Sequence, residues 1–192
     1  MRTKDFDEQE IIKKAVGLFW QKGYNGTSMQ DLIDGLGIGR SSIYHAFGDK
    51  HTLYLKALEL YQQEGTKRIV DTINAGPTIQ DAIRNLMKLS SSDRVLCGLP
   101  EGCFKVNAGV EVAVDDQEIL KLLREDDVII QNSLYNAIKQ HQDSGKLSPA
   151  KDPRALARFI CNTITGIRVY AKTHKEEGFF DDIINIALAV FD

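Results

Sequence analysis

The sequence has few prolines, few cysteines and no long apolar run. Its four prolines, at positions 77, 100, 149 and 153 of 192, leave long uninterrupted segments. Apolar residues recur in these segments with helical rather than alternating spacing, which predicts an all-α protein. The longest apolar stretch, residues 183–191, is too short to span a bilayer, and the charged first residues lack the apolar core of a signal peptide. We therefore expect a cytoplasmic protein with no membrane partner.

Residue patterns typical of enzymes and metal sites are also missing. The four histidines, at positions 45, 51, 141 and 174, are scattered, and no phosphate-binding glycine loop is present. The three cysteines match neither a zinc motif nor a CxxC redox pair. We therefore expect no enzymatic activity, no cofactor and no metal, and we interpret Cys97, Cys103 and Cys161 as free thiols in a reducing compartment.

Charge of one sign does not dominate, but the two parts of the chain differ. The net charge is -3, and hydrophobic residues make up 43% of the sequence, enough for a substantial core. Residues 13–56 nevertheless contain six basic and three acidic side chains. This distribution suits a basic head on an acidic body. We place the boundary between the two parts after residue 48, so that the head is 1–48 and the body is 49–192.

Local start and stop signals divide the chain into helices. Asp7 with Glu10 begins the first helix, Thr27 and Ser28 can cap a short second one, and Asp49 can cap a long helix that links head and body. Between the two short helices, glycines at 35, 37 and 39 predict a tight turn. The first helix is expected to end at 22–23, the second to contain Met29, Leu32 and Ile33, the third to span 40–47, and the long linking helix to run from Asp49 toward Ile73. Further helices are expected from Thr78 through Leu89, from 115–116 up to Gly145, and over about 152–173 and 179–191, with an apolar segment at 102–114.

The two short helices around the glycine turn point to DNA binding. A short helix held against another by a tight turn can enter the major groove, so that its first residues meet base edges. The segment from Thr27 to Leu58 closely resembles the signature of the TetR family in spacing and residue type. The matching positions are Thr27, Asp31-Leu32, Gly37-Ile38, Tyr44-His45-Ala46-Phe47 and Lys50, whereas Ile33, Gly39 and Ala46 depart from the family pattern.

We assign the DNA contacts residue by residue. Arg40 is expected to read guanine, because its guanidinium can bond two acceptors on that base, and Ser41 and Ser42 permit close approach. The alternative for Arg40 is a contact to phosphate alone. The residues expected to hold phosphates are Thr27, Ser28, Tyr44, His45 and Lys50. Core packing is the alternative for Tyr44 and the favoured interpretation for Phe47, and His45 has a plain surface position as its alternative.

The resemblance implies that residues 1–48 are a helix-turn-helix DNA-binding domain and that residues 49–192 are a helical ligand-binding and dimerisation domain. In the body it implies a pocket for an unknown small-molecule effector, whose binding swings the long helix after Asp49 and releases double-stranded operator DNA. The candidate lining residues place polar or aromatic groups among apolar helices. Core packing is the alternative for Met87, Tyr135 and Phe159, and Arg168 is expected either to pair with Glu111 or to bind an acidic ligand. The candidates are Tyr61, Met87, Cys103, Phe104, Asn107, Glu111, Tyr135, Phe159, Asn162 and Arg168.

The last two expected helices carry apolar residues on more than one face, so they need cover on two sides. A second copy of the chain can supply one cover, which predicts a homodimer through these helices, with burial inside a monomer as the alternative. Cys103 lies in a segment that looks like the GC-x-x-x-N stretch of one branch of the family. Lys105 and a helix amino terminus would favour its thiolate, so an oxidant or electrophile sensor is one hypothesis and a small buried side chain the other.

Taken together, the sequence predicts a transcriptional regulator, a repressor released by a small molecule or by an oxidant or electrophile. The main rival is a helical adaptor that keeps the helix-turn-helix shape but binds protein or RNA. That rival predicts loss of the phosphate donors, which the sequence retains.

Overall fold

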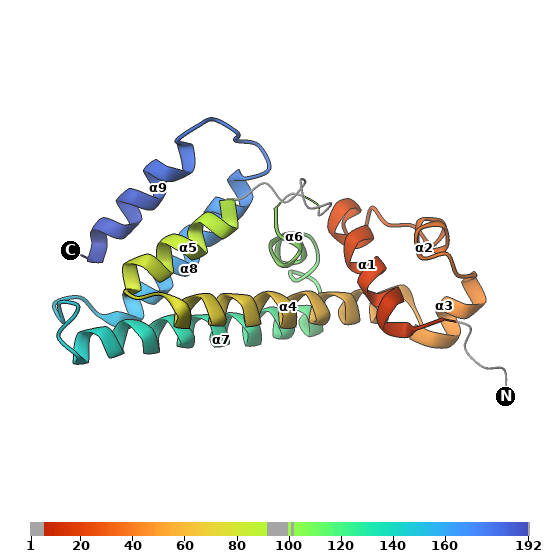
Figure 1. Cartoon of the computed structure of the whole chain (residues 1–192). Helices are drawn as coiled ribbons and strands as arrows, with labels where there is room; N and C mark the ends of the chain where they lie inside the picture. The colour runs from red at the N-terminus through yellow and green to blue at the C-terminus, as the bar shows by residue number, and fades with distance from the viewer. Residues whose placement is uncertain (1–5, 92–99, 101, 192) are drawn as a thin grey trace.

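The computed structural model describes residues 6–91, 100 and 102–191, and the regular elements in this part of the chain are all helical (Figure 1). The all-α prediction is therefore confirmed. The helices are α1 (Glu8–Lys22), α2 (Met29–Leu36), α3 (Arg40–Phe47), α4 (Lys50–Ala75), α5 (Ile79–Ser91), α6 (Phe104–Glu111), α7 (Gln117–Asp143), α8 (Pro153–Tyr170), α9 (Phe179–Leu188) and the short 3-10 segment η2 (Ala189–Phe191).

Local caps place most helix boundaries where the sequence predicts them. The side chains of Asp7, Ser28 and Asp49 accept hydrogen bonds from backbone N–H groups in the first turns of α1, α2 and α4. Such bonds satisfy donors that have no partner within the helix. Gly37 ends α2 with a φ of 71°, a left-handed conformation that glycine adopts without strain. These short-range signals are sufficient to fix the spacing between α2 and α3.

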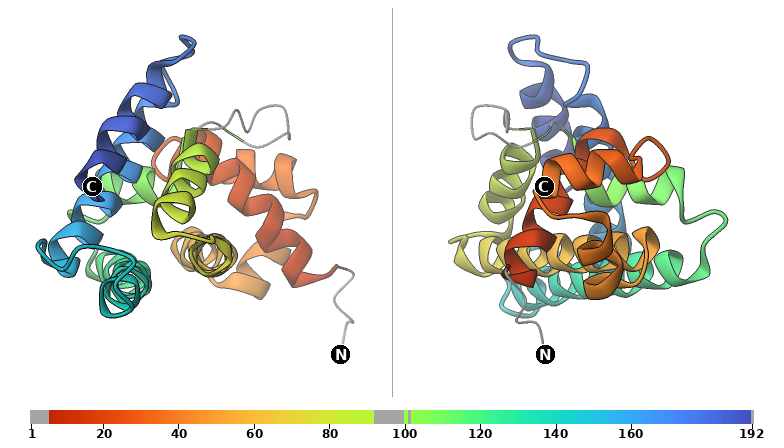
Figure 2. Two further views of the ribbon diagram at one scale, coloured as in Figure 1. Left: turned by 60° about the vertical axis from the view of Figure 1, so that its left-hand side comes forward. Right: turned by 90° about the vertical axis from the view of Figure 1, so that its right-hand side faces the viewer.

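The helices form a head and a body joined by a long helix. Helices α1 to α3 lie together at one end of the molecule, and α4 runs from them along the length of the body beside α7 (Figure 1). Helices α5, α8 and α9 pack on one side of this pair (Figure 2). Helix α6 lies between the head and the rest of the body, where it contacts α1, α4, α7 and α8.

The head shares its hydrophobic core with the body. Phe19 of α1, Tyr54 of α4 and Phe104 of α6 are fully buried, and their rings meet edge to face at centroid distances of 5.0 and 5.3 Å. Ala108 of α6 and Ile119 of α7 belong to the same cluster. A second cluster is built from α4, α5, α7, α8 and α9. Because α6 supplies part of the first core, a movement of α6 must shift the head residues that pack against it.

Asp116 caps α7 and also ties it to the start of α4. Its Oδ1 accepts the backbone N–H of Glu118 and Ile119, both at 3.0 Å, and its Oδ2 lies 2.6 Å from Nε2 of His51. Burial would raise the pKa of Asp116, but the Ile119 amide, His51 and the Glu118 amide together lower it below its ordinary value of 3.8. The ionised carboxylate is therefore the form that stabilises the fold.

We predict that Asp116→Ala lowers the free energy of unfolding by about 1–2 kcal/mol at pH 7, because the cap is lost. Thermal unfolding monitored by circular dichroism would then shift down by about 2–8 °C. The folded pKa is depressed, so the stabilisation is present above the unfolded pKa and disappears as pH falls through the folded value. The difference between wild type and variant should hence shrink below about pH 4. Asp116→Asn retains a capping oxygen and should recover most of the loss; equal destabilisation by both substitutions would contradict the capping role.

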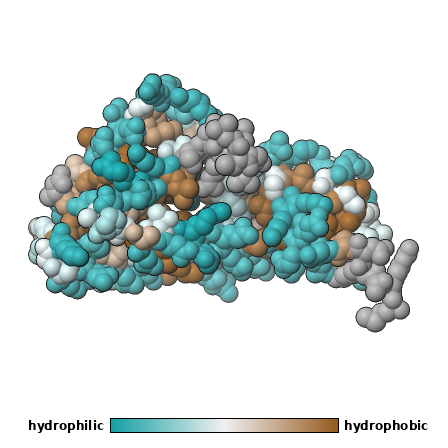
Figure 3. Space-filling model, in the orientation of Figure 1, coloured by the Kyte–Doolittle hydropathy of each residue, from teal (hydrophilic) through white to brown (hydrophobic). Residues whose placement is uncertain are grey.

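The surface of the described residues is mixed in character. Figure 3 shows apolar patches among polar side chains on both the head and the body. None of the helices in residues 6–91 and 102–191 is both long and apolar enough to cross a membrane.

Candidate nucleic-acid interface and effector cavities

Helix α3 buries apolar side chains on one side and exposes polar side chains on another. Ile43 and Phe47 are buried against the head core, at 0% and 3% exposure, which confirms the core interpretation of Phe47. Arg40, the first residue of α3, is exposed, and its guanidinium carbon lies 5.7 Å from the centroid of the Tyr44 ring. Tyr44 itself is 43% exposed, so the core alternative for this residue is wrong. The exposed or half-buried side chains of this surface are Arg40, Ser41, Ser42, Tyr44 and His45.

Thr27 and Ser28 have structural roles that the sequence did not predict in full. Thr27 is completely buried, and its hydroxyl donates to the carbonyl of Gly23 at 2.5 Å. The expected contact between the Thr27 side chain and a phosphate is therefore wrong for this conformation. Ser28 is exposed and forms a capping box with Asp31: the Asp31 N–H donates to Ser28 Oγ at 3.1 Å, and the Ser28 N–H donates to the Asp31 carboxylate at 2.8 Å. Ser28 is thus first a cap of α2.

Two lysines of the head are held in place by neighbouring side chains. Lys22 forms an ion pair with Asp31. The Nζ atom of Lys50 lies 4.4 Å from the centroid of the Tyr24 ring, a cation–π arrangement. Burial lowers the pKa of Lys50, and the nearby Glu111 carboxylate partly offsets this effect. Lys50 is half-buried, so its side chain has little freedom to move toward a phosphate.

Glu111, near the end of α6, bonds directly to the head. Its Oε1 accepts the backbone N–H of Asn25 at 2.7 Å, and its Oε2 accepts that of Tyr24 at 3.0 Å. The turn is shaped for this contact: Gly23 has a φ of 76° and a ψ of 172°, a region essentially restricted to glycine. A Cβ atom at Gly23 would lie 2.6 Å from the Glu111 carboxylate. We call this contact the α6–head clamp, consisting of Glu111 and residues 23–25.

The clamp bears on one of the two expectations for Arg168, its pairing with Glu111. Glu111 is occupied by head amides, so its pairing with Arg168 is wrong. No carboxylate among the described residues lies within 4.0 Å of the Arg168 guanidinium. The guanidinium is instead 3.8 Å from Sγ of Cys103.

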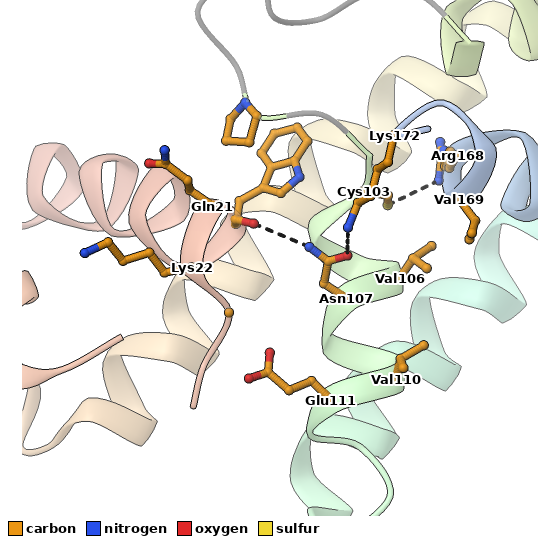
Figure 4. A pocket seen from close by; sticks show the side chains of 13 residues that line it. Gln21, Lys22, Cys103, Val106, Asn107, Val110, Glu111, Arg168, Val169 and Lys172 are labelled. Atoms are coloured by element: carbon orange, nitrogen blue, oxygen red, sulfur yellow. Dashed lines mark hydrogen bonds between the residues drawn. The ribbon is translucent and has the colours of Figure 1, made fainter. Parts of the chain in front are cut away.

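A hollow of about 890 Å³ lies between the head and the body. Figure 4 shows it bounded by α1 on one side and by α6 and α8 on the other. Asn107 of α6 connects two sides of the hollow. Its side-chain N–H donates to the Trp20 carbonyl at 3.4 Å, and its side-chain oxygen accepts from Lys172 at 2.7 Å. Cys103 also lines it. Head and body are therefore connected through α6 at more than one point.

Cys103 sits at the start of α6 and is only 2% exposed. The Tyr61 hydroxyl donates to its sulfur at 3.4 Å, and Arg168 approaches from α8. Cys161 is half-buried, and burial raises the pKa of its thiol to about 11, so it remains protonated at neutral pH. Cys103 and Cys161 are both free thiols, as predicted, whereas Cys97 lies outside the described residues.

A second, inner cavity of about 190 Å³ lies within the body. Its walls come from α4, α5, α6, α7 and α8, and it is mainly apolar with a few charged groups at one end. A small annex of about 30 Å³ adjoins it and shares Ile69, Leu89, Lys105, Ile130 and Arg168 with it. We call the two together the inner cavity.

The predicted pocket residues fall into two groups, those that line a cavity and those that do not. Tyr61, Cys103, Asn107, Glu111 and Arg168 line the hollow or the inner cavity. The other predictions are wrong, because helix packing turns these side chains elsewhere. Met87 and Phe104 are fully buried in the cores, Tyr135 packs on the second core and lies 4.0 Å from the Arg154 guanidinium, and Phe159 and Asn162 are on the exposed side of α8.

Sequence reasoning missed three polar residues at the inner cavity. Gln62 is 5% exposed, and the side chains of Lys105 and Asp126 are 13% and 9% exposed in a mutual ion pair. Thr66 of α4 also donates to Asp126. A usable signal was present: Asp126 stands three residues after Leu123 and four before Ile130, within the apolar stripe of α7. Polar residues on such a stripe are seldom buried without a partner or a function.

Within the described part of the chain, no three histidine, cysteine or acidic side chains come together as a possible metal site. The described residues combine an exposed helix α3, the α6–head clamp and a largely apolar cavity.

Comparisons with known proteins agree with this architecture. Residues 11–57 match the family model described as bacterial regulatory proteins, tetR family, and residues 80–186 match that of the tetracyclin repressor-like C-terminal domain. The two models together span the head and most of the body.

Individual relatives match over nearly the whole chain. The uncharacterized HTH-type transcriptional regulator YezE of Bacillus subtilis (strain 168) is 26% identical over 197 residues, covering 100% of this chain and 99% of YezE. The HTH-type transcriptional repressor ComR of Escherichia coli (strain K12) is 26% identical over 172 residues, covering 89% of this chain and 82% of ComR. A cysteine mutant of the TetR family transcriptional regulator CifR, complexed with 26-bp double-strand operator DNA, has the same fold, with a TM-score of 0.87 at 22% identity over 100% of both chains.

Proposed function

The chain belongs to the TetR family of bacterial regulatory proteins and is a DNA-binding transcriptional regulator, and from this premise we propose that it is a repressor that leaves its operator when a signal acts on the body. Relatives named as repressors, such as ComR, support repression rather than activation. The observation that carries the proposal is the position of α6, which lines the inner cavity and also bonds to the head.

For operator recognition, α3 enters the major groove, with Arg40 on a guanine and Ser41 and Ser42 beside it. The anchoring of α3 by Ile43 and Phe47 supports this role, because a reader must be rigid to hold its register. Tyr44, His45, Ser28 and Lys50 hold phosphates on either side. The buried Thr27 supports the turn before α2 rather than the DNA contact.

A homodimer through α8 and α9 brings two heads to one palindromic site. Support comes from large apolar side chains left open on these helices: Phe159, Val169, Tyr170 and Ile186 are 42%, 49%, 48% and 74% exposed. A two-fold axis would pair this surface with itself. The two heads must then meet grooves about 34–36 Å apart, so a small change in their separation weakens both contacts.

Helix α6 carries the signal from the body to the head. Lys105 and Gly109 of α6 line the inner cavity, whereas Asn107 and Glu111, on a different side of the same helix, hold the head. A ligand that fits the cavity better when α6 is displaced pulls on the α6–head clamp and reorients α2 and α3. Its differential affinity for the two states is what drives release.

The test of DNA-binding repression is selection of genomic fragments by the purified full chain, followed by binding titrations on the selected duplex. We expect a palindromic site and a strong salt dependence. With four or more phosphates contacted, affinity should fall roughly a hundredfold or more between 50 and 200 mM salt. Binding that ignores salt, or preferential retention of RNA, would favour a helical adaptor instead.

An oxidant or electrophile is one form the signal can take. Cys103 is 2% exposed, its sulfur is contacted by Tyr61 and Arg168, and the residue lines the hollow between head and body. Oxidation or alkylation adds atoms to this sulfur at the start of α6, disturbs both contacts and shifts the helix.

We predict that Cys103→Ser abolishes release of operator DNA by hydrogen peroxide or p-benzoquinone, measured by fluorescence anisotropy, while leaving basal binding intact. Cys161→Ser is the matched control and should respond like wild type, because its protonated thiol reacts slowly. Cys97→Ser serves as a second control. Normal release from the Cys103→Ser protein would eliminate this thiol as the trigger.

A further inference from the structure

The inner cavity has an apolar body and a polar end. Its apolar wall is formed by branched aliphatic side chains of five helices, and the charged groups come from α6, α7 and α8. A cavity of about 190 Å³ is somewhat larger than the roughly 150 Å³ apolar cavity that holds a benzene molecule. The main aliphatic residues are Leu86, Leu123, Ile130, Leu134 and Ile164.

Two cations, Lys105 and Arg168, lie at the polar end. The charge of Lys105 is already compensated, because its ammonium group pairs with both Asp126 and Asp127. Asp126 also accepts a hydrogen bond from Thr66. These four side chains satisfy one another and leave little capacity for a ligand.

Arg168 is different. It lines both the main space and the annex of the inner cavity, and within residues 6–91, 100 and 102–191 no carboxylate lies within 4.0 Å of its guanidinium. A half-buried arginine without a counter-ion is costly unless something anionic joins it. Its planar fork is well suited to a carboxylate.

Gln62 provides an independent indication. This α4 side chain is 5% exposed and lines the annex, yet neither its amide nitrogen nor its amide oxygen has a hydrogen-bond partner among the described residues. Buried amides nearly always have partners, so this one calls for a molecule in the cavity. Its N–H group can donate to the same anion that Arg168 binds.

We propose that the inner cavity binds a small organic carboxylate with one ring or a short branched chain. The carboxylate lies between Arg168 and the Gln62 amide, and the apolar part fills the space among Leu86, Leu134 and Ile164. A monoanion fits better than a phosphate ester, because Asp126 and Asp127 would repel a second negative charge. This inference rests on the proposed function, since it names the class of effector that acts on α6.

The test compares acids with their neutral amides on the full chain. Benzoate, phenylacetate and isovalerate are titrated by calorimetry against benzamide, phenylacetamide and isovaleramide, which match them in shape. At least one acid should bind at least about tenfold more tightly than its amide, as expected for a charge-assisted contact. If no acid binds more tightly than its amide, the proposal is overturned.

Variants then locate the binding site. Arg168→Met should weaken the binding of the best acid at least about tenfold and Gln62→Leu several-fold, whereas Arg124→Met, on the exposed side of α7, should have no effect. Arg168→Gln is a second variant in case methionine prevents folding. Undiminished binding by a folded Arg168 variant would also overturn the proposal.

Operator release distinguishes this proposal from the function it rests on. If an acid binds in an Arg168-dependent manner but leaves operator DNA bound, the ligand class stands and effector control through this cavity fails. If only neutral compounds release the DNA, effector control stands and the carboxylate assignment fails.

Discussion

Replacing Arg40 with alanine is expected to weaken binding to the selected operator by about 5- to 150-fold, the range for losing one bidentate contact to guanine. Arg40 is exposed at the first position of α3, where a groove-bound helix meets the bases. The substitution should leave the fold intact, because the buried face of α3 does not include this residue.

Fluorescence anisotropy on the selected operator and on a scrambled duplex measures this effect. A base contact predicts a large loss on the operator and a small one on the scrambled sequence. Arg124→Ala removes the same charge from the exposed side of α7 and should change neither affinity. Equal losses on both duplexes would instead assign Arg40 to a phosphate, and no loss on either would remove it from the interface.

The second large effect is expected from Glu111→Ala. This substitution removes both acceptors of the α6–head clamp, one for Tyr24 N–H and one for Asn25 N–H. Hydrogen bonds to charged groups contribute about 1.5–3 kcal/mol each, and the partial exposure of this pair brings the expected total to about 2–3 kcal/mol. The unfolding temperature should drop by about 4–12 °C.

Hydrogen exchange gives a local measurement of the same change. The amides of Tyr24 and Asn25 should lose protection in Glu111→Ala, and operator affinity should fall because the turn before α2 is no longer held. Asp115→Ala is the matched control, since Asp115 is a nearby exposed acid. Unchanged exchange at both amides would mean that Glu111 does not hold the head in solution.

The clamp also bears on how the head and body communicate. A swing of α4 was the expected route, and α4 does run continuously from the head into the body. The structure adds a second connection, because α6 contributes Phe104 and Ala108 to the head core and Glu111 to the head turn. A movement of α6 therefore reaches the head without first bending the 26-residue α4.

Much of the fold could be predicted from the sequence because its signals are local. Asp7, Ser28, Asp49 and Asp116 cap the helices that they precede, since a cap depends only on the next two or three backbone N–H groups. Gly37 ends α2 for a similar short-range reason. The exposed surface of α3 could also be predicted from the sequence, because a short helix with Ile43 and Phe47 on one side must present Arg40 and Tyr44 on another.

The lining of the cavities could not be predicted as well, because it depends on which side of each helix meets another. Helix α8 has apolar residues around much of its circumference, so periodicity alone did not show that Phe159 and Asn162 face outward while Cys161 and Arg168 face the cavity. Met87 and Phe104 were placed in the pocket on residue type and belong to the cores.

The sequence by itself determined the helical fold, most helix boundaries and the exposed surface of α3, all of which follow from residues within a few positions of one another. The tertiary structure alone decided that Thr27 is buried, that Glu111 bonds to the head rather than to Arg168, and that Gln62 and Arg168 lie at one cavity. The contacts of Glu111 join residues 86 and 87 positions apart. No local signal specifies such a pair, because it exists only once α1, α4 and α6 have packed around a shared core.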